Sequence, residues 1–224
     1  MLTPAHQYPT GVALSASRRQ KLLQWASEHD GLIVEDDYDA EHRYDRSPVA
    51  SVHAAAPDRV LHTGSVSKTL APALRLGWIV APTWLRDELL EAKHASDIAS
   101  PLLPQLALAQ MLTDGSYERH LRLTRRHQRG RRDEFVAALR KALPGARVSG
   151  LDAGLHLVLN LNGYDLDEVE LTDRLGRQGV LVDPLNRHRV RPGHPGLVLG
   201  YAGLTPQRLR SAADQIATTV SELS

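Results

Sequence analysis

The chain has 224 residues, 42% hydrophobic and 24% charged, with a formal net charge of +1. This length allows one large domain or two small ones, and the near-zero charge provides no global field that would attract nucleic acid or a membrane surface. The absence of cysteine excludes disulfides, thiolate metal sites and cysteine nucleophiles. No apolar run is long enough to span a bilayer, and MLTPAHQYPTG does not resemble a signal peptide. We therefore expect a cytoplasmic protein without a membrane partner.

Helices and short apolar strands alternate in the first half of the chain. Ser17 and Gln20 form a capping-box pattern for a helix that ends before Gly31. Continuous apolar runs at 32–36, 60–64 and 76–81 predict buried strands. This order predicts an α/β domain over residues 1–112 with a mainly parallel sheet and ligand sites at its strand ends.

A different pattern follows in the second half. Thr205 and Pro206 are typical of a helix start, and the apolar residues after them recur at helical spacing: Leu209, Ala213, Ile216 and Val220. Further helices are predicted at 116–143 and 166–178, and strands at 155–161, 179–183 and 197–202. These elements predict a smaller α+β domain over residues 113–224.

Two motif interpretations fail on spacing. A phosphate loop around GSVSKT would need glycine where the chain has Ser67 and His62. A calcium loop that begins at Asp37 would need glycine where the chain has His42. Most of the acidic segment 35–45 is therefore interpreted as a solvated loop.

Several side chains at the strand ends suit pyridoxal phosphate. Lys68 follows an apolar strand, where burial and nearby cations favour the neutral amine that a Schiff base requires. Hydroxyls and Arg75 nearby suit a phosphate. Asp36 and Tyr38 directly follow another strand, where a carboxylate can keep a pyridine nitrogen protonated and a phenol can donate to the ring oxygen.

Three motifs carry a resemblance to a known family: HQYPTG at 6–11, EDDYDAEHRYD at 35–45, and SVSK at 65–68 with an arginine seven residues later. Together they resemble the fold-type I pyridoxal-phosphate aminotransferases, most closely the aminotransferase-like domain of MocR-type regulators of the GntR family. The resemblance implies that Lys68 attaches the cofactor, Asp36 pairs with its pyridine nitrogen and Tyr38 faces its ring hydroxyl. It also implies that Ser65 and Arg75, with Ser67, hold the phosphate.

The chain departs from the aminotransferase pattern at two positions. Tyr8 stands where aminotransferases usually carry asparagine beside the ring oxygen, as is common in the regulator branch. Val198 stands where they usually carry an arginine for the substrate carboxylate. The resemblance to the regulators makes Arg187 the candidate carboxylate ligand, with an ordinary loop arginine as the alternative.

Two further features have structural interpretations. The arginines of the helix at 116–143 are spread around it without interleaved aromatics, which favours a solvated helix, partly facing a dimer partner, over a nucleic-acid surface. His156 would line the substrate entrance or be half-buried in its strand.

The resemblance covers the C-terminal half of an aminotransferase-like domain. We expect a pyridoxal-phosphate-binding part of a homodimeric transcriptional regulator that senses the cofactor, an amino acid or an amine. Contact with DNA is expected only through an N-terminal domain that these residues lack. An aminotransferase acting on an amino acid and a 2-oxo acid is one alternative, and a half-domain that binds no cofactor is another.

Overall fold

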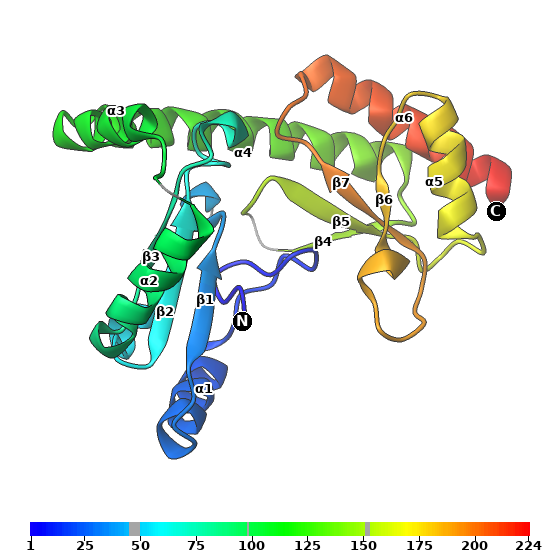
Figure 1. The fold of residues 1–224 in the computed structure, drawn as a ribbon. Coiled ribbons are helices and arrows are strands. Elements are labelled where there is room, and N and C mark those ends of the chain that lie inside the picture. The colour runs from blue at the N-terminus through cyan, green and yellow to red at the C-terminus, as the bar shows by residue number, and fades with distance from the viewer. Residues whose placement is uncertain (45–49, 98, 151–152) are drawn as a thin grey trace. The chain divides into compact units, whose positions relative to one another are not determined.

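The computed structural model of this chain describes residues 1–44, 50–97, 99–150 and 153–224 (Figure 1). The residues form two compact units. The first contains Met1–Gln7 and Ala13–Thr124, and the second contains Tyr8–Val12 and Arg125–Ser224. The domain limits at 112 and 113 that the sequence suggested stay a prediction.

The first unit is a three-stranded sheet with helices before and after it. Its strand order is β1-β2-β3, with β1 parallel to β2 and β3 antiparallel to β2. This unit supplies the α/β part of the predicted fold class. Its main elements are α1 (Ala16–Glu28), β1 (Ile33–Asp37), β2 (Val60–Ser65), β3 (Gly77–Val80), α2 (Arg86–Ser96) and α3 (Leu102–Thr113).

A small apolar core joins α1 to the sheet. Ala26 packs with Ile33, Val52 and Val60, all almost fully buried. The helix begins two residues earlier than the capping box predicts, because the Ser15 hydroxyl, not that of Ser17, accepts the amide of Arg18. Local sequence thus predicts the helix correctly and its cap wrongly.

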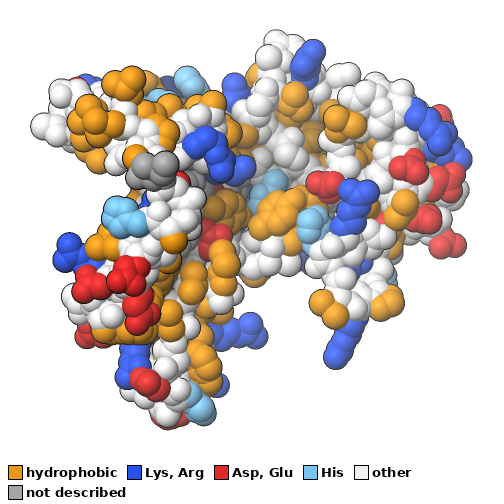
Figure 2. Space-filling model, in the orientation of Figure 1, with side chains coloured by type: hydrophobic (Ala, Val, Ile, Leu, Met, Phe, Trp, Pro, Cys, Tyr) orange, Lys and Arg blue, Asp and Glu red, His pale blue; other side chains and the backbone are white. Residues whose placement is uncertain are grey.

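The prediction that all three strands are buried is wrong for β3. Its four residues are exposed, including Trp78, Ile79 and Val80. β3 lies at the edge of the sheet, and an apolar run does not by itself specify what covers a strand. Hydrophobic side chains are also exposed along α3 (Figure 2), at Leu102, Leu103, Leu106 and Leu112.

The second unit is a four-stranded antiparallel sheet with helices. Its strand order is β4-β5-β7-β6, and α5 and α6 lie side by side (Figure 1). Helix α4 begins in the first unit and ends in this one. The elements are α4 (Ser116–Ala142), β4 (Arg147–Ser149), β5 (His156–Asn160), α5 (Glu168–Arg177), β6 (Asp183–Pro184), β7 (Gly196–Gly200) and α6 (Pro206–Leu223).

Helix α6 confirms the prediction from its sequence. The Thr205 hydroxyl accepts the amide of Arg208, Pro206 occupies the first turn, and the four apolar positions predicted to face the sheet are buried. The strand predicted over 179–183 is shorter than expected, since only Asp183 and Pro184 pair with β7. Across the described ranges, no helix combines the length and apolar character needed to cross a bilayer.

Candidate functional site

Two predicted site residues come from the carboxyl end of β1. β1 and β2 are parallel, and Asp36 lies opposite Thr63 in the register. The Thr63 hydroxyl lies 3.4 Å from Asp36 Oδ1 and 3.3 Å from the carbonyl of Glu35, so its proton serves both. Tyr38 follows two residues later and is partly buried. The parallel pairing brings the ends of both strands to one edge of the sheet.

Four more predicted residues come from the end of β2 and its connection to β3. Ser65 ends β2 opposite Gly77, and the ladder continues with the amide of Val66 donating to the carbonyl of Leu76 at 3.1 Å. Residues 66–76 therefore form one closed loop. Ser65 and Ser67 are partly buried, whereas Lys68 and Arg75 are exposed.

Arg75 has an unusual backbone conformation. Its φ of 50° lies in the left-handed region, at the end of a short helix over Pro72–Leu74. A residue other than glycine pays about 1 kcal/mol or more for this conformation. Such strain is often retained where a side chain must point in one direction.

Thr69, directly after Lys68, anchors this loop and was not predicted from the sequence. Its hydroxyl lies 3.0 Å from the hydroxyl of Tyr117, and its carbonyl accepts from His120 Nε2 at 2.7 Å. Thr69 itself is buried. The first turns of α4 thus hold the backbone next to the candidate cofactor lysine.

A buried histidine and carboxylate lie next to Tyr38 and were also missed by the sequence analysis. His6 Nδ1 lies 2.7 Å from Asp39 Oδ2, with side-chain exposures of 3% and 2%. The hydroxyl of Tyr38 lies 3.4 Å from the same ring nitrogen. Within the HQYPTG motif, His6 is the signal that could have directed attention to this pair.

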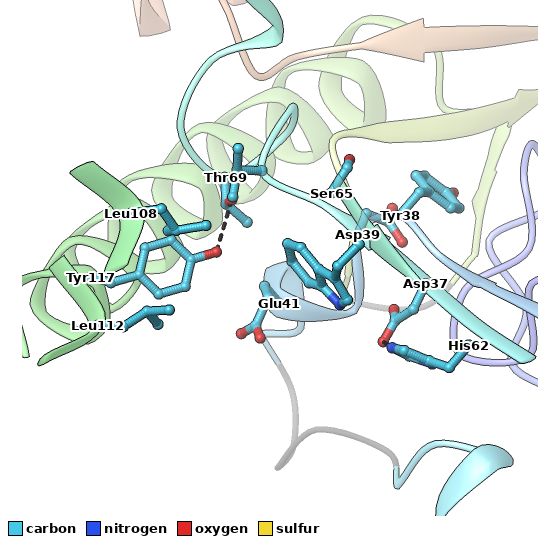
Figure 3. Close-up of a pocket in the computed structure, with 12 residues that line it drawn as sticks. Asp37, Tyr38, Asp39, Glu41, His62, Ser65, Thr69, Leu108, Leu112 and Tyr117 are labelled. Carbon is cyan, nitrogen blue, oxygen red and sulfur yellow. Dashed lines mark hydrogen bonds and ion pairs between the residues drawn. The ribbon is translucent and has the colours of Figure 1, made fainter. Parts of the chain in front are cut away.

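A cavity of about 340 Å³ opens beside these groups (Figure 3). Figure 3 shows Tyr38, Asp39 and Ser65 on one side of it, and Leu108, Leu112 and Tyr117 on another. The cavity therefore combines acidic and hydroxyl groups with an apolar wall from α3.

The two remaining predicted residues, Tyr8 and Arg187, belong to the second unit. The Tyr8 ring contacts His156 and His188 edge to face, at centroid distances of 4.8 and 5.2 Å. Burial raises the pKa of Tyr8, and the negative charge of Asp183 raises it further. His156 is half-buried, and its Nε2 donates to the carbonyl of Pro9 at 3.0 Å.

Arg187 already has an acidic neighbour. Its Nη1 lies 3.4 Å from Asp183 Oδ1, and both side chains are more than half exposed. Val198, which replaces the usual arginine, is buried and lies opposite Asp183 in the pairing of β6 with β7. A ligand carboxylate at Arg187 would therefore compete with Asp183.

The comparisons with known proteins identify the family. The model for aminotransferase class I and II matches residues 1–216. This chain belongs to the aminotransferase class I and II family. Family membership indicates pyridoxal phosphate as the cofactor, in agreement with the resemblance found in the three motifs.

Two curated relatives are about twice as long as this chain. It is 36% identical to the probable rhizopine catabolism regulatory protein MocR of Rhizobium meliloti, over 96% of this chain and 44% of the relative. It is 33% identical to the pyridoxine biosynthesis regulator PdxR of Corynebacterium glutamicum, over 99% of this chain and 48% of the relative. The chain thus spans about half the length of these regulators and corresponds to their aminotransferase-like part.

A solved structure gives the same fold. The α-aminoadipate aminotransferase LysN of Thermus thermophilus, complexed with N-(5'-phosphopyridoxyl)-L-leucine, has a TM-score of 0.89 and 26% identity. The match covers 99% of this chain and 58% of that one. The predicted fold class, part of the fold-type I large domain with a small α+β domain, is confirmed.

The side chains at the β1 and β2 ends fit pyridoxal phosphate by their chemistry. An exposed amine, an exposed guanidinium and two hydroxyls belong to the last residue of β2 and the loop that follows it, and the end of the adjacent strand carries a carboxylate and a phenol. An anionic phosphate, an aldehyde and a protonated ring nitrogen each find a complementary group in this set.

Proposed function

We propose that this chain is the pyridoxal-phosphate-binding, effector-sensing part of a MocR-type transcriptional regulator. The observation that supports the proposal is the closed loop between β2 and β3, which directly follows Ser65 and contains Ser67, Lys68 and Arg75. The similarity to MocR and PdxR supports the regulatory role.

Each residue has a defined role in the proposed site. Lys68 attaches the cofactor covalently through its amine, and Arg75 clamps the phosphate together with Ser65 and Ser67. Asp36 keeps the ring nitrogen protonated, and Tyr38 donates to the ring oxygen. When bound, the cofactor supplies an electron sink for the bonds at the α-carbon of an amino acid.

The family resemblance also gives Tyr8 and Arg187 roles in this proposal. The phenol of Tyr8 is protonated at neutral pH, as for an ordinary tyrosine with a pKa of about 10, and its raised pKa extends this form to higher pH, so Tyr8 is a hydrogen-bond donor. The carboxylate of an amino-acid effector displaces Asp183 from Arg187 and forms an ion pair with the guanidinium. An amine effector without a carboxylate would leave the pair of Asp183 and Arg187 intact.

Three broader properties belong to the same proposal. The protein acts in the cytoplasm and pairs with a second copy of itself, and the similarity to the regulators supports DNA binding through another domain and not through the aminotransferase-like part. The exposed apolar side chains of β3 and α3 support association with further protein surface.

Borohydride reduction tests the attachment of the cofactor. After incubation with pyridoxal phosphate and reduction, peptide mass analysis should find one reduced cofactor on the peptide that contains Lys68. The Lys68→Ala variant should lose this label, whereas Lys21→Ala, which changes an exposed lysine of α1, should retain it. Equal labelling of the wild type and Lys68→Ala would overturn the proposal.

A working aminotransferase is the second candidate, favoured by the similarity to LysN. Single-turnover mixing of the loaded protein with amino acids separates the two functions. A sensor should show a spectral shift without release of a 2-oxo acid, and an aminotransferase should release one equivalent. The sensor is favoured by Tyr8 and Val198, which stand where aminotransferases usually carry an asparagine and an arginine.

A further inference from the structure

His6 and Asp39 form a buried polar pair beside the phenol of Tyr38. The residues are separated by 33 positions in the sequence, and their contact of 2.7 Å is almost completely shielded from water. Burial of a carboxylate is costly unless a strong hydrogen bond compensates for it. The pair is therefore a fixed part of the fold at the end of β1.

The contact determines which ring nitrogen of His6 carries a proton. An ionised carboxylate can only accept hydrogen bonds, so Nδ1 must donate to Asp39 Oδ2. A protonated Nδ1 has no lone pair with which to accept a second bond. Asp39 thus selects the form of His6 with a hydrogen on Nδ1.

The hydrogen on Nδ1 restricts which hydrogen bonds the Tyr38 hydroxyl can make. The phenolic oxygen lies 3.4 Å from Nδ1, close enough to share its hydrogen weakly. Because Nδ1 cannot accept, the Tyr38 hydroxyl cannot donate to His6, and its proton must point in another direction. Tyr38 also borders the cavity, together with Ser65 (Figure 3).

We infer that His6 and Asp39 are positioning residues that fix Tyr38 as a hydrogen-bond donor toward the ring oxygen of pyridoxal phosphate. The inference rests on the proposed function. If the hydrogen of His6 were on Nε2 instead of Nδ1, the Tyr38 hydroxyl could donate to Nδ1. Only the lone pairs of the Tyr38 oxygen would then face the cofactor. Two acceptors would face each other, and the hydrogen bond to the ring oxygen would be lost.

The first test requires no cofactor. Two-bond ¹H–¹⁵N NMR spectra of the ¹⁵N-histidine-labelled chain report which ring nitrogen of His6 is protonated, with His6→Asn used to assign the resonance. We expect protonated Nδ1 in the wild type and a mixture of tautomers in Asp39→Asn, where the amide can also donate. Unprotonated Nδ1 in the wild type would overturn the inference.

The second test measures the cofactor's absorption maximum and dissociation constant. His6→Ala removes the Nδ1 hydrogen that orients the Tyr38 hydroxyl, and should therefore weaken binding by up to about tenfold, the cost of losing a hydrogen bond to a charged group, and shift the band as Tyr38→Phe does. His6→Asn places an amide donor near the position of Nδ1 and should restore both properties. In the Tyr38→Phe background, His6→Ala should have no further effect on either one.

His53 provides a matched control, because its Nδ1 donates at 2.7 Å to the carbonyl of Val60, away from Tyr38. His53→Ala should leave the absorption maximum unchanged. A shift in His53→Ala equal to that in His6→Ala, or a His6→Ala effect that persists without the Tyr38 hydroxyl, would show a purely structural role and overturn the inference. If the wild type binds no cofactor, the proposed function fails and this role fails with it, whereas the NMR result on His6 stands independently.

Discussion

The carbonyl oxygen of Thr69 accepts a hydrogen bond from His120 Nε2 at 2.7 Å. Thr69 directly follows Lys68, and His120 lies on α4, so this contact couples the loop of the candidate lysine to a helix 51 residues away in the sequence. The hydroxyl of Thr69 also lies 3.0 Å from the hydroxyl of Tyr117, so α4 contacts both the side chain and the backbone of Thr69.

Loss of the imidazole should destabilise this loop. We expect His120→Ala to lower the free energy of unfolding by about 1 to 3 kcal/mol, because the buried Thr69 carbonyl loses its partner. His120→Gln carries an amide that can reach the position of Nε2 and should retain most of the stability. Urea denaturation of the three proteins measures the difference, and equal losses in both variants would contradict a role for the hydrogen bond.

The left-handed conformation of Arg75 predicts opposite effects on folding and on binding. Arg75→Gly should leave stability unchanged or raise it by up to about 1 kcal/mol, because glycine adopts this conformation without a steric cost. The same change should weaken pyridoxal phosphate binding at least about tenfold through loss of the phosphate clamp. Arg75→Lys keeps the charge and the strain, and should lose affinity without gaining stability. An Arg75→Gly protein that is clearly less stable than the wild type would refute this account.

The raised pKa of Tyr8 predicts how stability depends on pH. Since folding favours the neutral phenol, its contribution is fully present below the ordinary tyrosine pKa of about 10 and is lost as pH rises through the higher pKa of the folded protein. Asp183→Asn removes one cause and should lower the pKa of Tyr8, leaving the effect of burial. Phenolate absorbance during alkaline titration, with Tyr8→Phe to identify the signal, measures both. A Tyr8 pKa that does not fall in Asp183→Asn would contradict the assignment of the charge effect.

Competition between Asp183 and a ligand carboxylate predicts a gain in affinity. An exposed ion pair contributes about 0.2 to 1 kcal/mol, so Asp183→Ala should tighten binding of an amino-acid effector up to about fivefold. Arg187→Ala should abolish the gain in the double variant. Calorimetric titration with a series of amino acids and their decarboxylated amines provides the comparison, and an equal gain for the amines would exclude Arg187 as the carboxylate ligand.

Local sequence patterns predicted elements whose determinants lie close together in the chain. Helix α6 follows from Thr205, Pro206 and its apolar spacing, all within a few turns. The three motifs of the site were also recognisable because each is a short continuous segment. The α/β order and the family could therefore be predicted from the sequence.

Contacts between distant segments could not be predicted in this way. The spacing of His6 and Asp39 in the sequence does not indicate that they are in contact, and the same holds for Thr69 and His120. Each pair comes together only in the folded protein. The exposure of β3 was missed for a related reason: its apolar composition is the same whether or not another segment covers it. Burial and pairing of distant residues depend on tertiary structure, not on local periodicity.

Cofactor binding through Lys68 is tested most directly by the visible absorption spectrum of the purified chain titrated with pyridoxal phosphate, measured beside that of Lys68→Ala. We expect a saturable band in the wild type that is absent in the variant. A folded wild-type protein that develops no band, or an equal band in Lys68→Ala, would contradict the claim that this chain binds the cofactor through Lys68.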